Sequence, residues 1–284
     1  MPVRIVTDST CDLPAETIAQ YGIWVIPLYI HVGRQSYLDG VDISRKDFYT
    51  QLPSFSTHPT TAVPSPEKFR AVYNALADEG ATEVISIHVS SAMSAIMDVA
   101  QLAAKDTIAL PVRVLDSRQL SLGTGFLVET AAKLAAQGCS VGEIIPVLND
   151  QIKRTYVFAL LDTMEFLKRS GRVNRIVAGL GTLLQIKPIM KMHDGIPTAE
   201  RVRTSSRAVE RLIQMLYDVG PMERVGIVHS NAPDRVAELR QKASHLLPAK
   251  DLLIVEITPV IGAHTGPGAA GFAVVASKQS NSLF

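Results

Sequence analysis

Short apolar runs alternate with helix-length segments along the first half of the chain. The runs are rich in β-branched residues and predict strands at Val3–Thr7, Trp24–Ile30, Glu83–Val89 and Pro111–Leu115. The segments between them predict helices at Pro14–Tyr21, Ser65–Glu79, Ser91–Lys105 and Ser121–Gln137. Alternation of this kind predicts a parallel sheet covered by helices, with the loops at the carboxyl ends of the strands open to ligands.

The second half is patterned differently. It predicts strands at Thr155–Leu160, Ile186–Lys191, Ile196–Arg203, Val225–His229 and Leu252–Ile257, and helices at Asp162–Arg169, Ser205–Val219 and Ala232–Leu246. Asp194-Gly195 between two apolar runs is a strong hairpin signal, so part of this sheet is antiparallel. We therefore predict two domains, residues 1–153 and residues 154–284, the second with an α+β organisation.

Composition excludes several functions. Hydrophobic residues make up 47% of the 284 residues and the net charge is +1, which argues against binding to nucleic acid or an anionic membrane but leaves room for a small anion site. No apolar run approaches the ~20 residues of a spanning helix, and the N-terminus lacks the apolar stretch of a secretory signal. Cys11 and Cys139 have no paired or metal-like spacing. We expect a cytoplasmic protein with two reduced thiols and without stable membrane insertion.

Polar residues follow the first predicted strand and precede the helix that starts at Ser65. Asp8 can bind a ligand or metal, or it can cap the next helix and brace a loop, which we favour. The loop Ser56–Pro64, which contains Thr61, carries hydroxyls and free backbone amides in front of a helix with a serine cap and a proline at its first position. Such a helix start suits a carboxylate or phosphate, although an ordinary capped loop explains the same residues.

A serine-rich segment follows the strand that ends at Val89. We expect Ser90 or Ser91 to cap the next helix, and Ser94, one turn inside it, to present its hydroxyl to a neighbouring loop. A nucleophilic Ser94 needs a nearby base and a strained turn such as Gly-x-Ser-x-Gly. That motif is absent here, so we do not favour a catalytic serine.

The most unusual segment is Ile261–Gly271, in which four glycines and a proline surround His264. Glycine lets a backbone approach a ligand closely, so we expect a loop that brings His264 to a bound group. As a cation His264 can pair with a buried carboxylate, or it can transfer a proton. Arg172 follows a glycine turn and can face an anion or lie solvated on the surface. No dinucleotide-binding, P-loop or metal-ligand spacing is present in the sequence.

Taken in order, these segments resemble the DegV family, whose members include the fatty-acid-binding subunits of bacterial fatty acid kinase. The resemblance runs through nearly the whole chain, over Thr7–Pro14, Thr61–Pro66, Ser90–Ser94, Asp116-Ser117, Leu161–Val173, Lys187–Ile189, Val202–Thr204 and His264–Gly271. The chain departs from the family at Ala62-Val63, where a polar pair is common, and at Ala95-Ile96, where Gly-Thr is common. Carboxylate binding therefore transfers to this chain better than a chain-length preference.

The resemblance implies a two-domain α/β fold. The first domain is a three-layer α/β/α structure around a parallel sheet, and the second is a two-layer α/β structure with a mixed sheet. One long-chain fatty acid is expected in a tunnel in or beside the first domain, where Thr61, Ser94 and His264 bind its carboxylate. Further candidate contacts of the head group or a partner are Arg172, Arg203, Gly266 and Gly268.

Three functions stay open on the sequence. The first is a non-catalytic carrier that presents the carboxylate to a separate ATP-dependent fatty acid kinase and itself binds no nucleotide or other cofactor. The second is an acyl-handling enzyme, an esterase or acyltransferase, that uses Ser94 and His264. The third is a sensor of a small anion or phosphorylated metabolite, which would use the same helix starts without a long tunnel.

Overall fold

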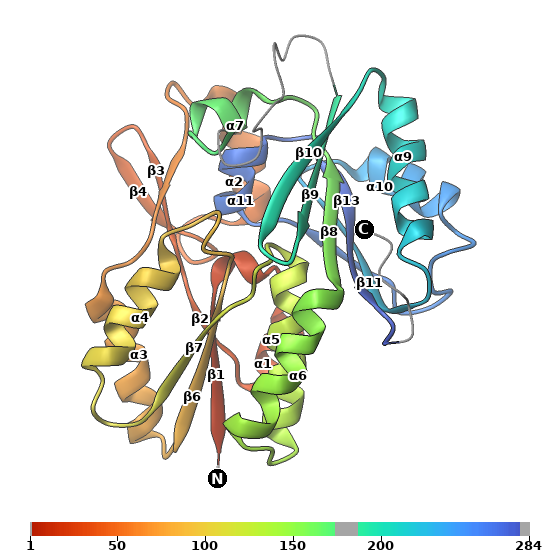
Figure 1. Cartoon of the computed structure of the whole chain (residues 1–284). Helices are drawn as coiled ribbons and strands as arrows, with labels where there is room; N and C mark the ends of the chain where they lie inside the picture. The colour runs from red at the N-terminus through yellow and green to blue at the C-terminus, as the bar shows by residue number, and fades with distance from the viewer. Residues whose placement is uncertain (1, 174–186, 279–284) are drawn as a thin grey trace.

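The first half of the chain is built on a four-stranded parallel sheet (Figure 1), seen in a computed structural model that describes residues 2–173 and 187–278. In sheet order its strands are β2 (Trp24–Ile26), β1 (Val3–Asp8), β6 (Glu83–His88) and β7 (Val112–Asp116). Helices α3 (Pro66–Asp78) and α4 (Ile96–Asp106) cover one face, and α1 (Ala15–Tyr21), α5 (Leu122–Ala136) and α6 (Val141–Arg154) cover the other. Val6 packs with the first pair of helices and Ile5 with the others, because neighbouring strand residues point to opposite faces. The predicted three-layer arrangement is confirmed.

The second half is built on a six-stranded mixed sheet. In sheet order its strands are β10 (Ile196–Val202), β9 (Lys187–His193), β8 (Thr155–Leu160), β13 (Ala270–Ala276), β11 (Met222–His229) and β12 (Leu253–Glu256). Helices α9 (Ser205–Asp218) and α10 (Pro233–Lys242) cover the outer face, where Phe158 is buried. Val157 and Met192 point to the inner face and pack with residues of the first half. The two-layer arrangement with a mixed sheet is confirmed.

The hairpin predicted at Asp194-Gly195 is also confirmed. It joins β9 to β10, and both turn residues have positive φ, 44° and 79°. Ile186, the first residue of the strand predicted there, lies outside the described residues. The domain division between residues 153 and 154 stays a proposal; α6 ends at Arg154 and β8 begins at Thr155.

A small antiparallel sheet, which the sequence pattern did not predict, extends the first half. It contains β4 (Gln35–Leu38), β3 (Tyr29–Val32) and β5 (Thr60–Ala62) in that order. The single strand predicted over Trp24–Ile30 is wrong, because β2 ends at Ile26 and β3 begins at Tyr29 in the other sheet. Pro27 lies in the break and has no N–H to donate to a strand ladder. Four further helices of the first half were not predicted: α6, which is 14 residues long, and the short η1 (Ser9–Cys11), α2 (Arg45–Gln51) and η2 (Leu52–Ser54).

The helix predicted from Ser91 begins only at Ile96. Ser91 donates both its N–H and its hydroxyl to the Asp116 carboxylate, which holds residues 91–94 in turns instead. The caps expected at Ser90 or Ser91 are therefore wrong. Two other helix starts also differ: α7 (Glu165–Arg169) begins three residues late, and Ser65 occupies the cap position of α3 without a side-chain cap bond.

The glycine-rich segment Ile261–Gly271 is a loop only at residues 266–269, and His264 itself lies in a helix. Residues Pro259–Thr265 form helix α11, with Thr258 as its cap and Pro259 at its first position. Strand β13 then begins at Ala270. Gly271 lies in the middle of the mixed sheet, where a Cβ would come within 2.0 Å of the Phe158 carbonyl oxygen. At least this glycine therefore serves strand packing rather than loop conformation.

Candidate functional site

A cavity of about 310 Å³ lies between the carboxyl edge of the parallel sheet and the inner face of the mixed sheet. Its volume is at the lower end of the roughly 300–1,000 Å³ typical of small-molecule sites. Apolar side chains from both halves make up most of the wall. The tunnel was expected in or beside the first domain; the structure places the cavity between the two halves, with β8 and α11 forming much of it.

One face of β8 and the residue after it run along the cavity wall. Val157, Ala159 and Leu161 all line the cavity, and at ~3.3 Å per residue this wall is about 13 Å long. Leu120 and Met192 lie with Val157 in one hydrophobic cluster. At the other end Leu161 clusters with further apolar residues of the second half. The cavity is therefore long enough to take an extended apolar chain.

The end of the cavity near Leu161 carries polar side chains. Arg172 donates its backbone N–H to the carbonyl of Leu167, a member of the Leu161 cluster, and its charge reaches His264. Ser94 follows Met93, which packs against the same cluster. We call this end, with Thr61, Ser94, Arg172 and His264, the polar end of the cavity.

Thr61 and His264 come from distant parts of the chain and meet there. Thr61 lies on β5, and His264 lies in the last turn of α11. Thr61 Oγ1 and His264 Nε2 are 3.0 Å apart. Burial lowers the pKa of His264 to about 3, helped by the charge of Arg172 and by His58. His264 is therefore neutral at physiological pH in the ligand-free protein, and its pairing as a cation with a bound carboxylate stays a prediction.

Thr61 and the neutral His264 together carry two hydrogen-bond donors, and their mutual hydrogen bond uses only one of them. A neutral imidazole carries a single N–H. If that hydrogen is on Nε2 it points to Thr61, whose own hydroxyl hydrogen is then free. If Thr61 donates instead, the hydrogen is on His264 Nδ1, which has no hydrogen-bond partner among the described residues. His264 Nδ1 has no partner among the described residues in either arrangement, as a bare acceptor in the first and as an N–H in the second. Only the first arrangement leaves Thr61 able to donate into the cavity, which suits an anionic group.

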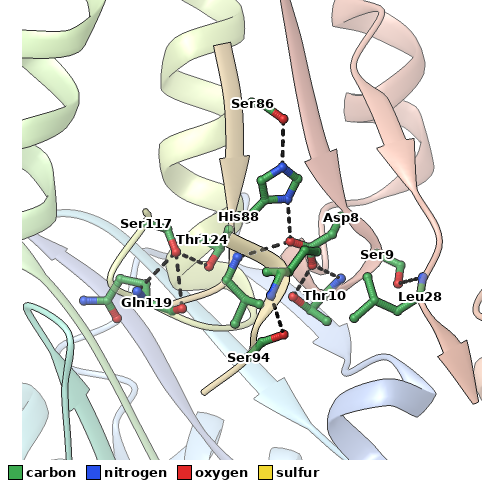
Figure 2. Close-up of polar contacts among 12 residues, drawn as sticks. Asp8, Ser9, Thr10, Leu28, Ser86, His88, Ser94, Ser117, Gln119 and Thr124 are labelled. Atoms are coloured by element: carbon green, nitrogen blue, oxygen red, sulfur yellow. Dashed lines mark hydrogen bonds and ion pairs between the residues drawn. The ribbon is translucent and has the colours of Figure 1, made fainter. Parts of the chain in front are cut away.

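Ser94 lies just before α4 rather than inside it. Its Oγ accepts the N–H of Ile96 at 3.3 Å, so its hydroxyl hydrogen stays available (Figure 2). No hydrogen bond joins Ser94 to His264 within the described residues, and the Nε2 of His264 is paired with Thr61. A nucleophile needs a base within hydrogen-bond reach. The geometry therefore gives no support to an acyl-handling enzyme that uses Ser94 and His264.

The other candidate contacts separate into two groups. Arg172 lines the cavity, and its guanidinium donates to the Ser170 carbonyl at 2.7 Å. Arg203 is exposed, one residue beyond the end of β10, and does not line the cavity. Gly266 and Gly268 do not line it either, and both have positive φ, 73° and 85°. They serve close packing, because a Cβ on Gly266 would lie 2.4 Å from the Phe166 ring and one on Gly268 3.2 Å from Asp162.

Asp8 braces two strand ends beside the cavity, as the sequence led us to favour. It caps η1 by accepting the Thr10 N–H, and it also accepts the Val89 N–H (Figure 2). His88 and Ser86 continue this network into the sheet, and their part was not predicted. Both lie on β6 with a period of two, the only sequence signal that they share a face.

Two structural findings limit the chemistry of the chain. Within residues 2–173 and 187–278, no group of His, Cys, Asp or Glu side chains is placed to hold a metal ion. Over the same ranges, no helix has the length and apolar character needed to cross a membrane.

Comparisons with known proteins agree with this architecture. A DegV domain-containing protein of Streptomyces coelicolor is 34% identical over 276 residues, which cover 96% of this chain and 98% of that protein. The fatty-acid-binding DegV family protein of Thermus thermophilus is 34% identical, with a TM-score of 0.88 and 98% and 100% of the two chains covered. DegV of Bacillus subtilis, also a fatty-acid-binding protein, is 29% identical, with a TM-score of 0.90 and the same coverage.

The family match covers almost the whole chain. The model of the family described as "Uncharacterised protein, DegV family" matches residues 2–277. The chain belongs to the DegV family.

Proposed function

We propose that this protein binds one long-chain fatty acid, with the carboxylate at the polar end of the cavity and the tail along β8 toward Leu120. The observation that carries the proposal is a mostly apolar cavity that Thr61, Ser94 and Arg172 also line, with Thr61 bonded to His264. The Thermus thermophilus and Bacillus subtilis relatives, which share this fold over their full length, are fatty-acid-binding proteins.

Tail and head group contribute differently to such binding. Each methylene removed from water contributes roughly 0.8 kcal/mol, so the tail supplies most of the affinity. Loss of ligand freedom offsets part of that gain. A buried carboxylate without partners is strongly unfavourable, so the donors at the polar end fix the direction of the ligand. Arg172 supplies a positive charge there, while neutral His264 orients the Thr61 hydroxyl.

The same geometry favours a carrier over an enzyme. The Thr61 and Ser94 hydroxyls can hold a carboxylate, and neither is paired with a base that would activate it for attack. We propose that the carrier presents the carboxylate to a separate ATP-dependent fatty acid kinase, as the family resemblance implies. Arg203 is our candidate for a contact with such a partner, because it is exposed and does not line the cavity.

Substitution of the two hydroxyl residues tests the placement of the carboxylate. Thr61→Ala and Ser94→Ala should each weaken palmitate binding by about 1–3 kcal/mol, because each removes a donor to a buried charged group. Affinity is measured on delipidated protein by displacement of a fluorescent fatty acid. Thr60→Ala is the matched control: Thr60 precedes Thr61 on β5 but is exposed and does not line the cavity, so its affinity should equal that of the wild type. Normal affinity in both Thr61→Ala and Ser94→Ala would place the head group elsewhere.

A further inference from the structure

A buried chain of hydrogen bonds, which the proposed function does not use, runs from α3 to the cavity wall. Tyr73 Oη lies 2.9 Å from Ser86 Oγ, and Ser86 Oγ lies 2.7 Å from His88 Nε2. His88 Nδ1 lies 2.9 Å from Asp8 Oδ2 (Figure 2). Ser86, His88 and Asp8 have no exposed surface.

The order of these side chains is that of a serine–histidine–aspartate triad, but their placement excludes nucleophilic chemistry. Ser86 is fully buried, does not line the cavity and contacts Tyr73 on its far side. The aspartate, not the serine, is next to the cavity wall. A triad needs its hydroxyl at the substrate, so the chain has another role.

Asp8 reaches the cavity wall through two residues. Its Oδ1 accepts the N–H of Thr10 at 3.0 Å and the Thr10 hydroxyl, and its Oδ2 accepts the N–H of Val89 at 3.1 Å. Thr10 and Val89 both line the cavity and lie just beyond the ends of the adjacent strands β1 and β6. One carboxylate therefore fixes the spacing of these two strand ends.

The same carboxylate reaches Ser94 through the backbone. The turns that end at Ser94 start directly after Val89, and the Ser94 N–H donates to the Ser90 carbonyl at 3.2 Å. Burial alone raises the pKa of Asp8, but the hydrogen bond and charge of His88, together with the bonds from Thr10 and Val89, hold that pKa below its usual value. Asp8 is therefore a carboxylate, which can only accept, and every one of its described bonds uses it as an acceptor.

We propose that Asp8 is a positioning residue for ligand binding, whose carboxylate fixes Thr10 and Val89 and, through Val89, the turns that present Ser94 to the ligand. His88 forms a hydrogen bond with Asp8 on the side away from the cavity. Ser86 in turn bonds to His88, and Tyr73 bonds to Ser86. This role rests on the proposed function for the identity of the ligand, but the hold on the turns exists without any ligand.

Two variants on opposite sides of His88 separate positioning from stability. Asp8→Asn keeps the shape but places an amide N–H₂ where a carboxylate oxygen accepts, so it loosens Val89 or Thr10. Ser86→Ala breaks the contacts to His88 and Tyr73 and leaves every bond to Asp8 in place. Both variants should have lower melting temperatures. Only Asp8→Asn should bind palmitate more weakly, by about tenfold.

Hydrogen exchange of the ligand-free proteins gives a readout that needs no fatty acid. Amides of residues 89–95 should exchange faster in Asp8→Asn than in the wild type and at the wild-type rate in Ser86→Ala. A wild type that binds no fatty acid while this exchange pattern holds would contradict the proposed function and leave the hold of Asp8 on the turns supported. Unchanged affinity and exchange in Asp8→Asn, or equal losses in both variants, would overturn the positioning role.

Thr10→Val provides a second test of the positioning role if the Asp8→Asn variant does not fold. It removes the hydroxyl that donates to Asp8 while making the cavity wall more apolar. If Thr10 only lines the cavity, the more apolar valine should strengthen palmitate binding. If Thr10 helps Asp8 to position the cavity wall, the substitution should weaken palmitate binding. Weaker binding supports the proposal, and stronger or equal binding overturns it.

Discussion

At the scale of single residues, the charge of His264 decides how the polar end works. Its hydrogen bond to Thr61 joins β5 to α11, and its burial keeps the ring neutral. A neutral ring orients the threonine hydroxyl without filling the cavity with a second positive charge beside Arg172. The cationic role that the sequence left open would need a bound carboxylate, because burial, which no local pattern reveals, keeps the ring neutral without one.

The buried neutral histidine should make stability depend on pH. In the folded protein the pKa of His264 is about 3, and in the unfolded chain it is near its usual 6.5. The unfolded state therefore binds an extra proton as pH falls below about 6.5, and stability is lost from there down to about pH 3. As the pH falls from about 7.5 to about 5, this group alone lowers the free energy of unfolding by about 2 kcal/mol.

His264→Gln should remove that loss. Glutamine can still form a hydrogen bond with Thr61 and does not titrate. The free energy of unfolding of the ligand-free variant, measured with urea, should therefore decrease over the same pH interval by about 2 kcal/mol less than that of the wild type. Equal pH dependence in the two proteins would show that His264 is not held neutral.

At the scale of elements, the contact between α7 and α11 sets the position of the helix that carries His264. Gly266 ends α11 with a φ of 73°, and the Phe166 ring of α7 lies directly on it. Gly266→Ala should lower the unfolding free energy by about 3 kcal/mol, because the backbone strain adds to overlap with the ring.

Gly138 provides the matched control for that substitution. It follows α5 with a φ of 85°, and a Cβ there would meet nothing within 4 Å. Gly138→Ala should therefore cost only the conformational part, about 1 kcal/mol. Urea denaturation of the two variants measures the difference, and equal losses would show that the Phe166 contact contributes nothing.

Sequence patterns predicted most elements near the site but not its fine structure. The alternation of strands and helices and the Asp194-Gly195 turn predicted the strands of the parallel sheet and all but one of the mixed sheet, whose inner strand β13 was missed. The three-stranded sheet was missed because its strands are three or four residues long and too short for a clear period. α11 was missed because its glycines suggested a loop, although Thr258 and Pro259 form an ordinary helix start.

The candidate site residues fall into two groups, those that line the cavity and those that do not. Thr61, Ser94, Arg172 and His264 all line one cavity, whereas Arg203, Gly266 and Gly268 do not. Resemblance placed the first group, since no local rule brings β5 and α11 together. Positive φ and close packing account for the choice of glycine at these two positions, and their contact with a head group or partner stays a prediction.

At the scale of the whole molecule, the cavity makes ligand binding a property of both halves. Its wall takes Thr10 and Val89 from the parallel sheet and Val157 and Ala270 from the mixed sheet. The halves also touch directly, since a Cβ on Gly123 of α5 would lie 2.6 Å from Val157 Cγ2. An acyl chain bound in this cavity would pack against both sheets at once.

Ligand should consequently protect both sheets from hydrogen exchange. At a palmitate concentration about 100 times Kd, binding adds about 2.7 kcal/mol of stability. Peptides from β6 and β8 should both slow on binding, whereas α10 on the outer face of the mixed sheet should change only through global stability. Protection confined to one sheet would contradict a cavity shared by both.

Mass measurement of the protein as expressed tests the central claim most directly. Native mass spectrometry should show a complex heavier than the chain by one C14–C18 fatty acid, and lipid extraction should release that acid. Delipidated protein should then rebind a single equivalent of such an acid, because the proposed site is one apolar cavity with one polar end. A protein that carries no acid and, once delipidated, binds none of the C14–C18 series would contradict the account.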